Sequence, residues 1–322
     1  MNSRPDTGGT TAPDRSGLIP LYRFWQPKYW GMWVAVLLLR LINPLPFRWQ
    51  MRIGQILGRL AMPFVPKRRR IAEINLRLCF PNLDDGEIDQ IVREHFESTG
   101  IAMIETGLAW FISAERAGRL VRLNGMELVV KELEQGHPVL LLSGHFPGGE
   151  IIGIDALRFL PEMAAMYRPT NNKFADQILR RSRGRSLAHL IPKDGLRDML
   201  RFLKKGVPVW YASDQAYDRK GSALVPFFSV PAMTNCALNQ IARVSKAKVI
   251  PYLPLRRPDL SGYDVTFLPA LENFPTDDEV ADAERVHKIL EEHILKAPAQ
   301  YYWLHRRFKN RPPPLPDVYA GL

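Results

Sequence analysis

The chain contains little cysteine for its length. Its 322 residues include two cysteines, Cys79 and Cys236, which are far apart and sit in apolar surroundings. Neither belongs to a CxxC pair or a His/Cys cluster of the kind that binds zinc, and two distant cysteines do not make a disulfide framework. We therefore expect both to be small core residues in a protein that faces a reducing, cytosolic compartment.

Several catalytic motifs are also missing. The sequence has no GxSxG elbow, no phosphate-binding P-loop, no HExxH zinc motif and no GxGxxG after a strand. These absences argue against a serine nucleophile, nucleotide hydrolysis and zinc chemistry. An enzyme that needs a histidine base and a carboxylate remains possible.

No long hydrophobic run follows the initiating methionine directly, which argues against a secretory signal peptide. Residues 1–17 are polar and aperiodic, and we expect a disordered tail there. The longest apolar stretch, 29–42, would reach about 21 Å as a helix, short of the roughly 30 Å hydrocarbon core of a bilayer. Flanking tryptophans nevertheless suggest a membrane interface. Three interpretations stay open: a short transmembrane anchor, a helix lying in the interface, and a buried core helix.

Acidic residues are the minority charge. The 44 Lys and Arg against 33 Asp and Glu leave a formal net charge of +11, and the basic residues cluster at 67–70 and 180–185. An anionic partner is therefore expected, such as nucleic acid, a phosphorylated lipid, a membrane surface or an acidic protein. Residues 48–64 read as an amphipathic helix with a basic face, which suits an anionic leaflet.

From about residue 121 the sequence alternates short apolar runs with helical segments. This alternation predicts an α/β fold: a single domain with a central mixed sheet flanked by helices, preceded by an N-terminal membrane-anchoring helix. We expect a membrane-anchoring, amphipathic region at 18–66, the α/β domain at 67–312 and a mobile Pro-rich tail at 313–322. The stretch around 220–233 is expected to be a long loop.

The segment VLLLSGHFPGGE, 139–150, is the strongest candidate for a catalytic centre. A buried strand ends in a Gly/Pro loop that carries His145, and Glu150 begins the next helix. A histidine and a carboxylate that converge in this way can form a general base and its orienting acid. Gly148 and Gly149 would allow a substrate to approach the backbone closely.

Other strand ends carry polar groups that could hold a substrate. Arg168 ends the strand after the His/Glu helix and can bind a phosphate or carboxylate. Asp214 and Gln215 end another strand, where Asp214 could order active-site Arg and His groups, and Lys220 could meet a phosphate. The block at 301–309 mixes aromatic and basic residues, which suits a membrane interface or single-stranded nucleic acid. His305 within it is expected to pack or hydrogen-bond.

Taken together, these blocks resemble a known family. His145-Phe-Pro-Gly-Gly-Glu150 fits the H-x4-[DE] box of lysophospholipid-type acyltransferases. The remaining blocks resemble, in order and spacing, the late acyltransferases of lipid A biosynthesis over roughly residues 20–312. They are Tyr167-Arg168-Pro169, Ser213-Asp214-Gln215 with Lys220-Gly221, Val225-Pro226-Phe227-Phe228 and the segment 303–309.

The resemblance implies transfer of a fatty acyl chain from acyl carrier protein to a hydroxyl of a lipid A precursor, without cofactor or metal. It implies an inner-membrane enzyme whose catalytic domain faces the cytoplasm, with His145 as base, Glu150 as its orienter and the basic surface at 180–185 as the carrier-protein site. Two alternatives use the same dyad: acylation of another glycolipid or a phospholipid, and an esterase or thioesterase reaction. A non-enzymatic binder of membranes or nucleic acid is a third, although clustered strand-end groups disfavour it.

Overall fold

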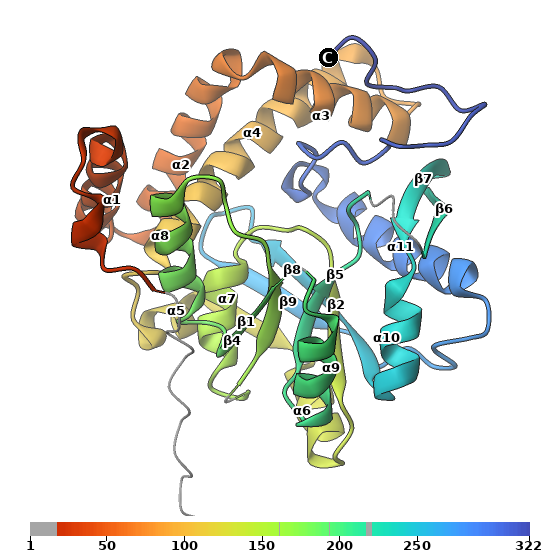
Figure 1. Ribbon diagram of the computed structural model, residues 1–322. Coiled ribbons are helices and arrows are strands. Elements are labelled where there is room, and N and C mark those ends of the chain that lie inside the picture. The colour runs from red at the N-terminus through yellow and green to blue at the C-terminus, as the bar shows by residue number, and fades with distance from the viewer. Residues whose placement is uncertain (1–17, 161, 193, 217–220) are drawn as a thin grey trace, which may run out of the picture.

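The core of the protein is a seven-stranded mixed sheet with the order β1-β9-β8-β2-β5-β3-β4 (Figure 1). The computed structural model describes residues 18–160, 162–192, 194–216 and 221–322. All neighbouring strands pair in parallel except β8 and β9. The predicted α/β class with a mixed central sheet is therefore confirmed. The strands are β1 (Val121–Asn124), β2 (Val139–Ser143), β3 (Ala164–Tyr167), β4 (His189–Pro192), β5 (Val209–Ala212), β8 (Lys248–Arg256) and β9 (Tyr263–Phe267).

Helices cover both faces of the sheet. All five residues of β2 are buried, as expected of a central parallel strand with both faces covered. Leu141 packs on one face against α5, α6 and α7, and Leu140 and Leu142 pack on the other against α9, α10 and α11. These helices are α5 (Ala114–Leu120), α6 (Met126–Glu134), α7 (Gly149–Ala156), α9 (Leu196–Lys204), α10 (Ala237–Ser245) and α11 (Glu279–Lys296). A further helix, α8 (Lys173–Arg183), lies between β3 and β4 in the chain.

A helical layer precedes the sheet in the chain and lies along one side of it. It contains α1 (Trp30–Ile42), α2 (Phe47–Ala61), α3 (Pro66–Cys79) and α4 (Asp85–Leu108). Figure 1 shows α2, α3 and α4 grouped together, while α1 lies apart at the outer edge beside α8. Asp84 begins α4 with a capping box, in which its side chain accepts from the Glu87 N–H and Glu87 accepts in return from the Asp84 N–H.

Glycine allows α2 and α4 to touch backbone to backbone. A Cβ atom on Gly58 would lie 2.0 Å from the Phe96 carbonyl oxygen, and one on Gly100 would lie 2.2 Å from the Gly54 carbonyl oxygen. Any larger side chain would push the two helices apart. The amphipathic helix expected at 48–64 is therefore attached to the domain through its glycine face.

The structure does not support the transmembrane interpretation of the N-terminal region. No helix among the described residues is long and apolar enough to cross a bilayer. The most apolar one, α1, has 13 residues, which is about 20 Å of helix against the roughly 30 Å required. The chain turns back after Ile42, and the next helix, α2, carries a basic and polar face.

The segment expected to be a loop forms a two-stranded antiparallel hairpin, β6 (Ser222–Phe227) and β7 (Val230–Asn235). Pro226 and Pro231 sit opposite each other in this two-stranded sheet, in which both strands are edge strands. Such edge positions tolerate proline. Phe228 and Ser229 have positive φ angles and make the turn.

Much of the aromatic and basic block near the C-terminus lies inside the protein. Trp303, Arg307 and Phe308 are buried in a core that they share with α3, α4 and the β6–β7 hairpin. Arg307 donates to the Met233 carbonyl and the Thr234 hydroxyl. The membrane and nucleic-acid interpretations of this block are therefore corrected.

The Pro-rich end of the chain is held in place, contrary to the expected mobile tail. Tyr319 is buried, its hydroxyl accepts from the Phe308 N–H at 3.1 Å, and it donates to the side chain of Asn75 on α3. In Figure 1 this segment (blue) runs beside α3. The predicted tail at 1–17 lies outside the described residues.

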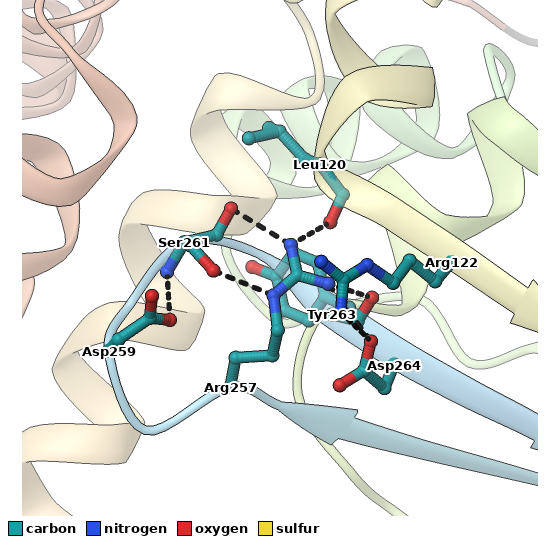
Figure 2. A network of polar contacts seen from close by, with 7 residues as sticks. All are labelled: Leu120, Arg122, Arg257, Asp259, Ser261, Tyr263 and Asp264. Atoms are coloured by element: carbon teal, nitrogen blue, oxygen red, sulfur yellow. Dashed lines mark hydrogen bonds and ion pairs between the residues drawn. The ribbon is translucent and has the colours of Figure 1, made fainter.

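Arg257 fixes the turn between β8 and β9 (Figure 2). Its guanidinium donates to the Leu120 carbonyl, the Tyr263 carbonyl, both oxygens of Ser261 and the Asp264 carboxylate at 2.7–3.0 Å. The Arg257 side chain therefore joins the β8–β9 turn to Leu120, the residue that precedes β1.

The contact between α2 and α4 can be tested with two glycine substitutions. Gly58→Val should lower the free energy of unfolding by about 1–3 kcal/mol or more, because the new side chain overlaps backbone that cannot move locally. Gly31→Ala on α1 is the matched control, since no atom lies within 4 Å of its added Cβ. Urea unfolding should give a lower midpoint for Gly58→Val alone, and equal midpoints would contradict the close packing.

Candidate active site

The imidazole of His145 pairs with the carboxylate of Asp214. The distance from His145 Nδ1 to Asp214 Oδ1 is 2.7 Å, and the backbone N–H of His145 donates to Asp214 Oδ2 at 2.8 Å. Both carboxylate oxygens therefore hold the same residue, which fixes the position of the loop as well as the ring. Because Oδ1 accepts from Nδ1–H, the lone pair is left on Nε2.

Strand pairing brings the two residues together. β2 and β5 are parallel neighbours, and their register places Ser143 opposite Ala212. His145 and Asp214 each lie two residues beyond this pair, so they leave the sheet side by side. The two residues are 69 positions apart in the sequence, and the strand register brings them into contact.

The pair is electrostatically coupled. Burial by itself would lower the pKa of His145, but the charge and hydrogen bond of Asp214 outweigh it, and the pKa is raised above its ordinary value. Burial would raise the pKa of Asp214, but the interactions with His145 outweigh that in turn and hold it far below its ordinary value. Asp214 is therefore a carboxylate at neutral pH, and it stabilises positive charge on the imidazole.

Gln215 and His305 complete the surroundings of the pair. The Gln215 side-chain amide lies 3.0 Å from His145 Nε2, and the backbone N–H of Ala216 donates to His305 Nε2 at 3.2 Å. The expected hydrogen-bonding role of His305 is confirmed: it holds the loop that carries Asp214 and Gln215. Its position in the aromatic and basic block gave no sign of which loop it would meet.

Glu150 does not contact the imidazole in the way that the sequence suggested. Its carboxylate pairs with Arg183 of α8, at 3.1 Å from Oε1 to Nε. Because Glu150 sits in the first turn of α7 and Asp214 at the end of β5, the sheet register gives the orienting position to Asp214. The assignment of Glu150 as orienter of His145 is therefore corrected, although both residues line the same cavity.

That cavity has a volume of about 700 Å³, and His145 is among the residues that line it. Its walls come from one face of α4, from α7 and from the sheet, and most of the side chains are apolar. Leu141, Trp210 and Tyr252 form the sheet wall, and Leu160 and Met163 lie at the far end. The size falls within the range of ligand-binding cavities, and an apolar lining with one polar end fits a fatty acyl chain.

The two glycines of the loop have different roles. Gly148 adopts a left-handed conformation with φ of +83°, and a Cβ there would lie 2.6 Å from the Tyr263 ring. Gly149 begins α7 and lines the cavity, and nothing lies within 4 Å of its Cβ position. The first-turn N–H groups of α7 have no acceptor within their own helix and are suited to bind negative charge.

Of the remaining candidates, Arg168 is not brought to the cavity, whereas Arg183 lines it. Arg168 is exposed at the end of β3 and is absent from the cavity wall. Lys220 lies outside the described residues. In the expected carrier-protein surface at 180–185, Arg181 binds the Ile19 carbonyl, Arg183 binds Glu150, and Arg185 binds the Ala109 carbonyl. These arginines connect elements of the domain.

The fold and site together define a class of protein: an α/β protein in which a histidine pairs with a buried carboxylate beside a largely apolar cavity. A family model described as bacterial lipid A biosynthesis acyltransferase matches residues 21–310. The chain belongs to this family and is an acyltransferase.

Two relatives from Escherichia coli (strain K12) are each 37% identical to the chain. The lipid A biosynthesis palmitoleoyltransferase aligns over 90% of this chain and 94% of its own length. The lipid A biosynthesis lauroyltransferase aligns over 91% and 96%. A lipid A biosynthesis acyltransferase from Haemophilus influenzae is 36% identical over 90% of this chain and 93% of its own. The two Escherichia coli relatives are named for different acyl groups, so identity does not select a chain length.

The pairing of His145 can be tested by titration. Asp214→Asn removes the interactions that raise the pKa of His145 and leaves burial and Arg183, which both lower it. The pKa should therefore fall from above to below about 6.5. Two-dimensional NMR of labelled imidazole nitrogens measures this directly.

Glu150→Gln is the matched control for that titration. Glu150 acts on the pKa of His145 only through its partner Arg183, so this variant should shift that pKa far less than Asp214→Asn does. A large shift in Glu150→Gln with none in Asp214→Asn would restore the His145–Glu150 pairing.

Proposed function

We propose that the protein transfers a fatty acyl chain from the thioester of acyl carrier protein to a hydroxyl of a lipid A precursor. The observation that carries this proposal is the His145–Asp214 pair, whose histidine lines the apolar cavity. The acceptor follows from what the relatives are named for. The acidic carrier protein suits a chain with a net charge of +11.

In the proposed mechanism His145 acts as a general base. Its Nε2 takes the proton of the acceptor hydroxyl while the hydroxyl oxygen attacks the thioester carbonyl carbon. The C–O bond forms and the C–S bond breaks, and the proton passes from His145 to the departing thiolate. Asp214 stabilises the imidazolium that exists between these two proton transfers. Gln215 occupies the hydrogen-bonding position on Nε2 that the acceptor hydroxyl would take.

The first turn of α7 is the proposed site for the oxyanion. Gly149 lines the cavity beside His145, and its helix presents N–H groups and the positive end of its dipole there. Arg183 adds a positive charge at the same end, held by Glu150 at 3.1 Å. Glu150 would thus act by holding Arg183 toward the cavity, with a role distinct from that of Asp214.

The cavity is the proposed site of the acyl chain. It runs from the carboxyl ends of the strands, where His145 lies, to Leu160, Met163 and Leu187, which flank the amino ends of β3 and β4. A chain that enters from the site would therefore lie along the face of the sheet. The side chains at the far end limit its length.

We also propose that α1 and α2 lie in the interface of the bacterial inner membrane, with the catalytic domain on its cytoplasmic side. Between them they expose apolar residues that a folded protein normally buries: Trp30, Val34, Leu37, Leu38 and Leu41 on α1, and Trp49, Ile56, Leu57 and Leu60 on α2. Exposed Lys67 and Arg70 follow directly on α3. Apolar side chains beside basic ones favour an anionic lipid surface.

The role of His145 can be tested with His145→Ala. Loss of the general base should reduce acyl transfer by about 10²–10⁴-fold, while membrane association stays near that of the wild type. Mass spectrometry of the lipid product with acyl carrier protein donor and lipid A precursor acceptor gives the rate. Near-normal turnover would rule out the mechanism, and free fatty acid in place of acylated glycolipid would favour a thioesterase.

The membrane surface can be tested by making α1 polar. The triple substitution Trp30→Ser, Leu37→Ser and Leu41→Ser removes exposed apolar area without touching the buried core. It should release protein from vesicles that contain anionic lipid in a flotation assay. Val244→Ser is the control, because Val244 is 68% exposed on α10. Equal flotation of the triple variant would place the membrane contact elsewhere.

A further inference from the structure

A second histidine lines the cavity and has no part in the proposed acyl transfer. His95 lies on α4, is 2% exposed and faces the same cavity as His145. Its Nδ1 lies 3.1 Å from the carbonyl oxygen of Ala299, while its Nε2 is buried and has no hydrogen-bond partner in the part of the chain that the structure describes. Buried polar atoms in folded proteins are nearly always hydrogen-bonded.

The chemistry of this free nitrogen follows from its surroundings. A carbonyl oxygen can only accept, so Nδ1 carries the hydrogen and Nε2 carries a lone pair. Burial lowers the pKa of His95 to about 4, and the ring is therefore neutral at pH 7. Nε2 is consequently an acceptor, and its partner must bring an N–H or O–H group.

The neighbouring polar groups already have partners. The Ser98 hydroxyl accepts from Arg256, and the Thr99 hydroxyl donates to the His95 carbonyl. Gln300, on the opposite wall, is bonded through its side chain to the backbone of Arg256. The buried Nε2 of His95 has no such partner among the described residues.

This position lies at the same end of the cavity as the reacting imidazole. The segment 299–302 touches both histidines: the Ala299 carbonyl accepts from His95, and the backbone N–H of Tyr302 donates to the His145 carbonyl at 3.2 Å. Leu160, Met163 and Leu187 lie at the opposite end. A group that binds His95 would therefore belong to the part of an acyl substrate near its reacting carbon.

We infer that His95 Nε2 accepts a hydrogen bond from a hydroxyl or amide N–H group that an acyl substrate carries close to its reacting end. The inference rests on the proposed function, because it takes the cavity to hold acyl chains. A hydroxyl would belong to a hydroxylated acyl chain, and an N–H to an amide-linked chain or to the amide-containing arm of the thioester. An unsubstituted chain leaves the buried acceptor unpaired, so the site discriminates against it.

The test compares binding of three uncharged probes to the full-length purified protein. Methyl dodecanoate has no donor, methyl 3-hydroxydodecanoate has a hydroxyl, and N-methyldodecanamide has an N–H. Wild-type protein should bind at least one of the two donor probes about tenfold or more tighter than the plain ester. The donor probe with the higher affinity shows whether the site binds a hydroxyl or an amide N–H group. Isothermal titration or quenching of the fluorescence of Trp210, which lines the cavity, measures the affinities.

Two variants separate hydrogen bonding from structure. His95→Asn keeps an N–H group where Nδ1 donates to Ala299 and removes the acceptor at Nε2, while His95→Phe keeps the ring shape and removes both. Each should bind the plain ester as the wild type does and lose the preference for the donor probe. If His95→Phe fails to fold, His95→Asn decides the question.

The outcomes separate this inference from the proposed function. Equal binding of all three probes by the wild type, or a preference that survives in His95→Asn, overturns the role of His95 and leaves acyl transfer standing. Failure of every probe to bind overturns the acyl cavity itself and with it the proposed function. A uniform loss of affinity for all probes in His95→Asn shows a packing role and contradicts the inference.

Discussion

The parallel pairing of β2 with β5 is the constraint on which the site depends. Its register sets Ser143 opposite Ala212, so His145 and Asp214 emerge from the sheet at the same level and meet. Asp214 then holds both the backbone and the ring of His145. A shift of one residue in this register would turn each side chain to the other face. The His145–Asp214 pair is thus a consequence of sheet geometry, and Gln215 and His305 contact residues whose positions the strands have already fixed.

The second requirement is a straight, closely held α4, because this helix forms a long wall of the cavity. On one side the glycines of α2 and α4 place the two backbones in contact. On the other, Glu105 forms a buried ion pair with Arg256 of β8, at 2.8 Å, and accepts a hydrogen bond from Tyr263 of β9. A buried pair of this kind is costly to break, since either partner alone would be an unpaired buried charge. The cavity wall is thereby tied to both the helical layer and the sheet.

In both the N- and C-terminal parts of the chain, the burial of the side chains differs from what composition suggests. The aromatic and basic residues near 303–309 look like a surface patch, yet Trp303 and Arg307 fill the space between α3, the β6–β7 hairpin and α11. The apolar residues of α1 look like a span, yet they lie on the outside of a helix too short to cross a bilayer. A protein that lies in the membrane interface would bury the exposed apolar side chains of α1 and α2 in the lipid.

The sequence by itself determined the α/β class, the central strand that carries His145 and the family, and for His305 it left packing and hydrogen bonding both open. Local patterns suffice for these features, because apolar runs and glycine or proline loops report strand ends directly. Tertiary structure decided which carboxylate reaches His145, because Glu150 is near in sequence whereas Asp214, 69 residues away, is near through strand register. It also decided the β6–β7 hairpin, the burial of Arg307 and the unpaired nitrogen of His95. Each of these depends on contacts between distant segments, which no local spacing records.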